Sequence, residues 1–252
     1  MLRLAVEFAR SWATRFVDVQ GVDRAMALAA QAFSALIPLL IVTSAVISRD
    51  DGESFADDLI DRFDLTGSTA DSVELAFTSS QTVENSISVL GLVLLTVAAL
   101  SFTRGLQRLY EGAYGLPSRG YRNTPWGLAW LAVIALYATL RPVLAGVFND
   151  GAVRAGASIA LAAGAWTITP HLLLGRRLEW RRLVPGGLLT ALGMTLLEAS
   201  SVIWMPETIS SSAEQFGAIG VAFALLSWVV GAGFVLVAAA TGGAVIAEGR
   251  SR

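Results

Sequence analysis

Two ionisable side chains lie deep inside apolar stretches of the 252-residue chain, Arg141 within residues 126–148 and Glu198 within residues 185–204. Read as membrane helices, each residue stands about 20 Å from the arginine-flanked end of its stretch, at a rise of about 1.5 Å per residue. Ionisable residues inside a membrane span are rare, and by default they mark functional sites. We expect Arg141 and Glu198 either to face a shared aqueous cavity or to form a structural ion pair. Outward snorkelling of Arg141 beside Pro142 also remains open.

The first apolar stretch carries two further candidates for the same cavity, Gln31 and Pro38. Residues 25–47 contain no charge, and as a helix they are long enough to cross a hydrocarbon core of about 30 Å. Gln31 is polar enough to line a cavity or to bond across helices. Pro38 removes one backbone hydrogen bond and can turn carbonyl groups towards a cavity, although proline kinks also occur in inert bundles.

Composition places the whole chain in a membrane. It is 54% hydrophobic and 15% charged, with a mean hydropathy of +0.62. We predict an all-α, six-span bundle forming one membrane domain over residues 25–248, followed by a short tail, 249–252. The predicted spans are residues 25–47, 87–103, 126–148, 155–174, 185–204 and 218–247. We expect a polar loop after residue 204 and a close-packing ridge of small residues at Gly156, Ala160 and Gly164.

Two segments outside these spans also have a helical pattern. In residues 1–24, Phe8 and Trp12 share one helical stripe while Glu7 and Arg10 share another, which favours a helix lying on the membrane surface. Residues 48–86 contain ten of the twenty acidic residues and two short helical patterns, which predict a small acidic helical cap outside the membrane. The acidic spacing matches no EF-hand loop, so we favour a solvated acidic face over a Ca²⁺ site.

The arginines predict the orientation. Fourteen of the eighteen arginines flank the predicted spans on one side, and by the positive-inside rule this places both termini in the cytoplasm of a bacterium, with the chain in its inner membrane. Some of these arginines could form a cytoplasmic rim that holds anionic lipid headgroups. They could equally serve topology alone. The candidate rim residues are Arg104, Arg108, Arg176, Arg177, Arg181 and Arg182.

Three stretches carry a resemblance to a known family: AAQAFSALIPLLIV (29–42), SFTRGLQRLYEGAYG (101–115) and FGAIGVAFALLSWVVGAGFVLVAAATGGAVIAE (216–248). Their order and spacing are similar to those of the YihY/BrkB family of bacterial inner-membrane proteins. Many members have an acidic residue where this chain reads Ala240 to Ala244, so a role for that acid does not carry over. The resemblance implies six membrane helices and an activity in transport or in handling envelope lipids.

The sequence favours a transporter or lipid translocase for an anionic or amphiphilic envelope substrate. The alternative is a non-transporting scaffold that docks envelope-assembly proteins. We expect no enzyme, cofactor or metal site, because the chain has one histidine, no cysteine and no visible nucleophile–base pair. Membrane lipids are the expected partners. Envelope proteins and a second copy of the chain remain open as partners, and no nucleic acid is expected.

Overall fold

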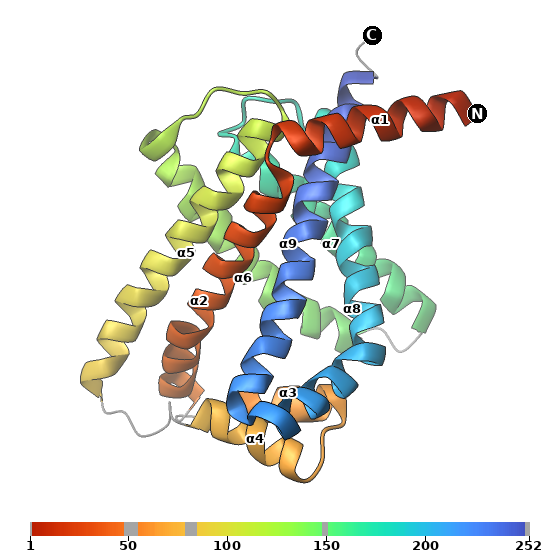
Figure 1. Ribbon diagram of the computed structural model, residues 1–252. Helices are drawn as coiled ribbons and strands as arrows, with labels where there is room; N and C mark the ends of the chain where they lie inside the picture. The colour runs from red at the N-terminus through yellow and green to blue at the C-terminus, as the bar shows by residue number, and fades with distance from the viewer. Residues whose placement is uncertain (1, 48–54, 79–84, 148–150, 250–252) are drawn as a thin grey trace. The chain divides into compact units, whose positions relative to one another are not determined.

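The computed structural model describes residues 2–47, 55–78, 85–147 and 151–249, and these are helical with no strand among them (Figure 1). The elements in chain order are α1 (Leu2–Asp18), α2 (Gly21–Ile47), α3 (Phe55–Phe63), α4 (Ser68–Thr78), α5 (Asn85–Ala113), a 3₁₀ turn η1 (Gly120–Asn123), α6 (Thr124–Val147), α7 (Gly151–Leu173), α8 (Trp180–Phe216) and α9 (Ala218–Gly249). The all-α class is therefore confirmed.

Each of the six predicted spans falls in a helix, α2 and α5 to α9. Over the described residues, four helices are long and apolar enough to cross a bilayer: Gly21–Leu39 of α2, Leu90–Ala113 of α5, and the whole of α8 and α9. The helix that contains the second predicted span extends beyond it, because α5 ends at Ala113. The count of six crossings stays a prediction.

Two local predictions were wrong. The predicted polar loop after residue 204 is helical, since α8 continues to Phe216; Met205, Ile209 and Ala213 recur at helical spacing and are buried. The first helix ends at Asp18 rather than near residue 24, and α2 begins at Gly21 after Gln20, whose φ is 54°. At the predicted ridge on α7, a Cβ atom added to Gly156 or Gly164 would meet no described atom within 4 Å, so close packing there stays a prediction.

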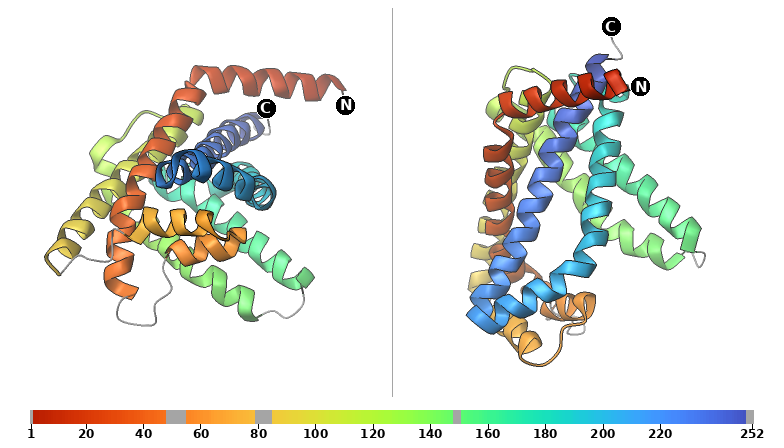
Figure 2. Two further views of the ribbon diagram at one scale, coloured as in Figure 1. Left: turned by 60° about the horizontal axis from the view of Figure 1, so that its bottom comes forward. Right: turned by 45° about the vertical axis from the view of Figure 1, so that its right-hand side comes forward.

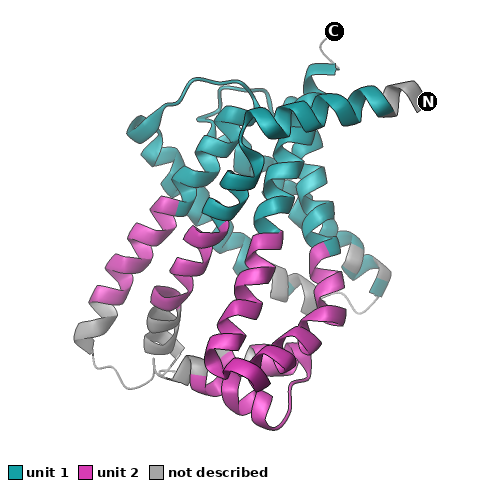
Figure 3. Cartoon of the chain, viewed as in Figure 1, with its two compact units in different colours: residues 1–28, 102–196, 232–252 teal, residues 29–101, 197–231 magenta. Residues whose placement is uncertain are grey.

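The chain divides into two compact units (Figure 3). Unit 1 comprises residues 1–28, 102–196 and 232–252, and unit 2 comprises residues 29–101 and 197–231. The core of unit 1 is apolar and draws on α2, α5, α6, α7, α8 and α9; its buried residues include Leu28, Leu106, Leu109, Tyr110, Trp130, Leu173, Leu183 and Val237. The helices α6 and α7 pack against each other and run side by side in both views of Figure 2.

In unit 1, α1 lies across the C-terminal end of α9 (Figures 1 and 2). The Trp12 indole N–H donates to the carbonyl of Ala238 at 3.1 Å. Arg15 donates to both carboxylate oxygens of Glu248, each at 2.7 Å, and to the carbonyl of Ala113 at 2.8 Å. These bonds fix the rotation of α1 about its own axis, and so determine which of its stripes faces the end of α9.

Glycines allow the helices of unit 1 to approach closely. A Cβ atom added to Gly243 of α9 would collide with the backbone of Gly186 in α8. A Cβ atom added to Gly233 would lie 2.5 Å from the carbonyl oxygen of Ala25 in α2. Small residues serve this purpose in membrane helices, because lipid supplies no hydrophobic force to drive helices together and association depends on close contact.

Unit 2 has its own apolar core. It is formed by α3 and α4 together with parts of α8 and α9, and its buried residues include Ala56, Leu59, Phe63, Val73, Met205, Ile209 and Val221. Both short helices predicted in the acidic segment are therefore present as α3 and α4, with apolar faces buried. The expected position of this segment outside the membrane stays a prediction.

The contact between α8 and α9 yields a test on stability. We expect Gly243→Ala to lower the free energy of unfolding by about 1–3 kcal/mol, because the added methyl group displaces the backbone at Gly186. The matched control is Gly156→Ala, where the space is open and alanine favours the helix by up to about 1 kcal/mol. Thermal unfolding of both proteins in detergent makes the comparison, and equal midpoints would contradict the close contact.

Candidate functional site

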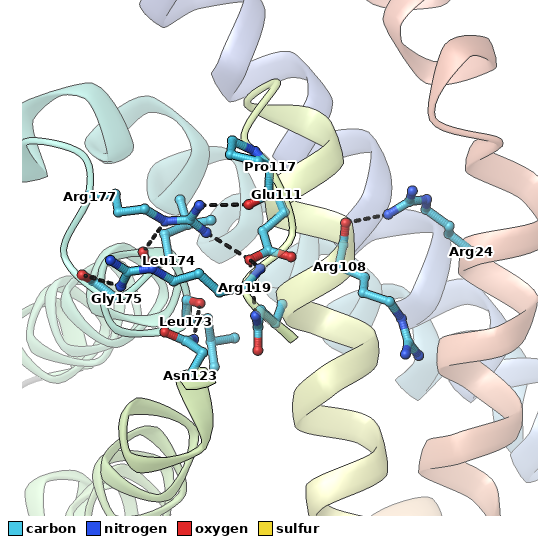
Figure 4. A network of polar contacts seen from close by, with 11 residues as sticks. Arg24, Arg108, Glu111, Pro117, Arg119, Asn123, Leu173, Leu174, Gly175 and Arg177 are labelled. Carbon is cyan, nitrogen blue, oxygen red and sulfur yellow. Dashed lines mark hydrogen bonds and ion pairs between the residues drawn. The ribbon is translucent and has the colours of Figure 1, made fainter. Parts of the chain in front are cut away.

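A buried carboxylate organises the polar residues near the end of α5. The side chain of Glu111 is only 3% exposed, and its Oε1 atom accepts three hydrogen bonds (Figure 4). The donors are Nη2 of Arg177 at 2.7 Å, Nε2 of Gln107 at 3.0 Å and the backbone N–H of Arg119 at 3.0 Å. The Oε2 atom is buried without a hydrogen-bond partner. A buried carboxylate needs such pairing, because desolvation of an unpaired charge is strongly unfavourable.

Helical periodicity brings Glu111 inside. Leu106, Leu109 and Tyr110 on α5 are buried in the core of unit 1. Gln107 and Glu111 are four residues apart, so they lie one above the other on the helix beside that apolar stripe. Packing of the stripe therefore carries both polar side chains into the protein, where the Gln107 amide supports the carboxylate.

Arg177 ties Glu111 to the segment between α7 and α8. Its remaining donors are also used, with Nε bonded to the carbonyl of Leu174 at 2.8 Å and Nη1 bonded to that of Pro117 at 2.7 Å. The chain turns sharply just before it, where Gly175 has φ 62°. A side chain there would be strained and would crowd Asn123 Oδ1 at 2.7 Å, so the turn requires glycine.

A second set of bonds joins the same turn to the start of α6 (Figure 4). The Asn123 amide, buried in η1, donates to the carbonyl of Leu173 at 2.6 Å. The Arg119 side chain donates to the carbonyl of Gly175 at 3.5 Å. Glu111, Arg119, Asn123 and Arg177 thus hold three chain segments in one arrangement, which we call the Glu111 network.

Two cavities border the Glu111 network, and arginines line both. The smaller, of about 160 Å³, is lined by Arg104, Arg108 and Gln107 with Ser118, Gly120 and Tyr121. The guanidinium carbon of Arg104 lies 4.1 Å from the centre of the Tyr121 ring, a cation–π contact that orients the arginine while leaving its charge unneutralised. Arg24 adds a third guanidinium nearby, because it donates to the carbonyl of Arg108.

The larger cavity, of about 580 Å³, lies at the turn between α7 and α8. Its charged lining is Arg176, Arg177, Arg181 and Glu179, with His171, Leu178 and Trp180 completing the wall. Arg176 lies 5.8 Å from the centre of the Trp126 ring. The Nδ1 atom of His171 is buried without a hydrogen-bond partner.

The six predicted rim arginines divide into two kinds. Arg177 forms an ion pair inside the protein and serves the Glu111 network. The other five make no ion pair with a described carboxylate: Arg104, Arg108, Arg176, Arg181 and Arg182. Guanidinium groups in this state favour phosphate or carboxylate ligands, which they can bind in a bidentate manner. Hereafter these five residues are the arginine rim.

The four predicted cavity residues lie on three helices. Gln31 and Pro38 are in α2, with Gln31 half-buried and its Oε1 atom lacking a hydrogen-bond partner. Glu198 is half-buried in α8 and takes part in an interaction. Arg141 lies in α6, but its side chain is outside the described residues. Its relation to Glu198 stays a prediction.

Sequence reasoning missed Glu111 itself. One signal was present: Glu111 is the single acidic residue in an arginine-rich segment, one helical turn after Gln107. Among the described residues, no group of three or more His, Asp or Glu side chains could hold a metal ion. Burial raises the pKa of the Tyr114 phenol to about 12, so the hydroxyl group is neutral at physiological pH.

Comparison with known proteins gives one match. The family model described as Virulence factor BrkB matches residues 12–252, which is nearly the whole chain. The chain matches no curated protein and no solved structure.

The ion pair provides a stability prediction. We expect Arg177→Met to lower the free energy of unfolding by roughly 3–5 kcal/mol, because it leaves the Glu111 carboxylate buried and unpaired. The double change Glu111→Met, Arg177→Met should be more stable than the single one, since no buried charge remains. Denaturant unfolding in detergent measures both proteins. Arg181→Met, at an exposed and unpaired arginine, is the control, and equal loss in both single variants would contradict the role of the pair.

Proposed function

The chain belongs to the BrkB virulence factor family, and on that basis we propose that it is an integral protein of the bacterial inner membrane with six crossings and both termini in the cytoplasm. Four long apolar helices among the described residues support membrane insertion. The helices α6 and α7, which pack against each other, would supply the remaining two crossings.

Charge segregation supports this orientation. Of the eighteen arginines, only Arg49 and Arg62 fall in unit 2, whereas the ten acidic residues of segment 48–86 all do. By the positive-inside rule, the arginine-rich helix ends of unit 1 would face the cytoplasm. Helices α3 and α4 would then form the acidic cap on the opposite side.

We further propose that the protein is a transporter or lipid translocase for an anionic or amphiphilic envelope substrate. The observation that carries this proposal is the arginine rim, five arginines without a described carboxylate partner, four of which line the two cavities. Positive charge without an internal partner at the end of membrane helices suits a phosphate-bearing headgroup in the adjoining leaflet. The role is binding and movement, with no catalytic step.

The route into the membrane would involve Arg141, Glu198, Gln31 and Pro38. Gln31 supports this part of the proposal, because its buried Oε1 atom has no hydrogen-bond partner among the described residues. Water or a polar substrate group would satisfy that oxygen. Pro38, inside α2, is a position where the helix cannot form its full set of backbone bonds.

The second candidate function is a scaffold that docks envelope proteins. One observation favours it: α3 and α4 bury their apolar faces and leave Asp61, Asp71 and Glu74 exposed beside the exposed side chain of Leu75. Such a surface suits a basic protein partner. Translocation without any partner would favour the first function.

Headgroup binding by the arginine rim is testable with one pair of variants. The double variant Arg104→Gln/Arg108→Gln should bind phosphatidylglycerol, supplied in liposomes or nanodiscs, at least several-fold more weakly than the wild type does. The reason is that two guanidinium groups without a described carboxylate partner are lost. Native mass spectrometry can count the bound anionic lipids. Arg154→Gln, an exposed arginine of α7 outside the rim, is the matched control. Equal lipid counts in both proteins would contradict headgroup binding at this cavity.

Translocation is tested on purified protein in liposomes made from bacterial lipids. Lipid exchange between leaflets and efflux of small anions are followed in three samples. These are liposomes with the wild type, liposomes with the double variant Arg141→Ala/Glu198→Ala, and empty liposomes. We expect movement that requires the protein and falls at least tenfold in the double variant. Identical signals from all three samples would exclude translocation by this protein without a partner. Crosslinking of the acidic cap would then test the scaffold function.

A further inference from the structure

Two further cavities lie away from the arginine rim, where α1 crosses α8 and α9 in unit 1. An apolar groove of about 430 Å³ runs beneath α1. Its walls are Phe8 and Trp12 from α1, Leu192 and Leu196 from α8, and Val235 and Ala238 from α9. Leu192 and Leu196 are more than half exposed, at 58% and 60%, so the groove presents an apolar surface that no described residue covers.

A polar pocket of about 670 Å³ adjoins this groove. It is lined along α1 by Glu7, Arg10, Ser11, Thr14 and Asp18, and at the end of α9 by residues that include Glu248. Phe8 lines both the pocket and the groove, so the two are neighbours along α1. The volume of each falls within the range of about 300–1,000 Å³ that is typical of small-ligand sites.

The helical period of α1 explains why polar and apolar sites adjoin. Glu7, Ser11, Thr14 and Asp18 recur every three or four residues and form one stripe, whereas Phe8 and Trp12 form the neighbouring stripe. The Trp12 bond to Ala238 and the Arg15 ion pair with Glu248 hold α1 in this rotation. Such neighbouring apolar and polar stripes are typical of helices that lie in the membrane interface, with one side on acyl chains and the next on headgroups.

The charges in the polar pocket indicate the kind of headgroup. Among the described residues, Arg15 and Glu248 neutralise each other, and Asp18 lies about 12 Å along the helix from Arg10. Arg10 and Glu7, one helical turn apart, are therefore the pair of opposite charges that one headgroup can reach. A carboxylate this close to the cation disfavours a purely anionic headgroup. The pair complements a headgroup that carries both a phosphate and an ammonium group, because each charge then meets the opposite sign.

We propose that this groove and pocket bind one zwitterionic glycerophospholipid, with its phosphate on Arg10, its ammonium group on Glu7, and an acyl chain along Leu192 and Leu196. The site differs from the arginine rim in its residues and in its headgroup preference. Its occupant would bridge α1, α8 and α9, and would thus act as a structural lipid of unit 1.

Native mass spectrometry of the full chain tests the proposal with phosphatidylethanolamine and phosphatidylglycerol as probes. We expect one phosphatidylethanolamine molecule to be retained in preference to phosphatidylglycerol. Retention should fall at least fivefold in Arg10→Gln, which removes the phosphate ligand, and in Leu192→Gln, Leu196→Gln, which makes the groove polar at exposed positions. Arg122→Gln, an exposed arginine lining neither cavity, should retain the lipid.

Two results would overturn the proposal: equal retention of both lipids by the wild type, or unchanged phosphatidylethanolamine retention in both groove and pocket variants. The rim variant Arg104→Gln, Arg108→Gln separates this site from the proposed function, because it should keep the zwitterionic lipid while losing anionic ones. Thermal unfolding with added phosphatidylethanolamine gives a second readout. A stabilisation present in Arg122→Gln and absent in Arg10→Gln is expected, and stabilisation of both would count against the site.

Discussion

The carboxylate of Glu111 imposes the constraint on which the arrangement of unit 1 depends. It is nearly inaccessible to solvent, so its charge must be balanced by groups that reach it from other parts of the chain. Arg177 supplies the opposite charge from the turn before α8, and the backbone of Arg119 supplies a donor from the segment before η1. A single oxygen atom thereby fixes the positions of three segments, and these segments carry the arginines that line both neighbouring cavities.

Close contact between helices provides the rest of the framework. Gly243 and Gly186 allow the backbones of α9 and α8 to come into contact, and Gly233 allows the same between α9 and α2. In lipid, such contacts replace the hydrophobic force that holds soluble helices together. The side chains of the five arginines of the arginine rim take no part in the glycine contacts or in the Glu111–Arg177 ion pair. Their charges are available to ligands, which is the physical basis of the proposed headgroup binding.

Much of this structure could be predicted from sequence, because apolar runs and helical stripes are local signals. The positions of α2, α5 and α9 followed from such signals. The extension of α8 to Phe216 did not, since its polar residues suggested a loop while the buried Met205 and Ile209 depended on distant partners. The burial of Glu111 and the separate role of Arg177 could likewise not be predicted from the sequence. Spacing along the chain does not reveal which arginine finds a carboxylate in space.

The proposed orientation and the proposed headgroup binding both require the Glu111 network to lie at the cytoplasmic face of the membrane. The chain has no cysteine, so single cysteines can be introduced and labelled without background. Ser118→Cys places an exposed thiol beside the network, and Ser68→Cys places one at the start of α4. Each variant is treated with a membrane-impermeant maleimide, first in intact spheroplasts and then after lysis. We predict labelling at residue 68 in intact spheroplasts and labelling at residue 118 only after lysis. The opposite pattern, or equal labelling of both before lysis, would contradict the proposed orientation.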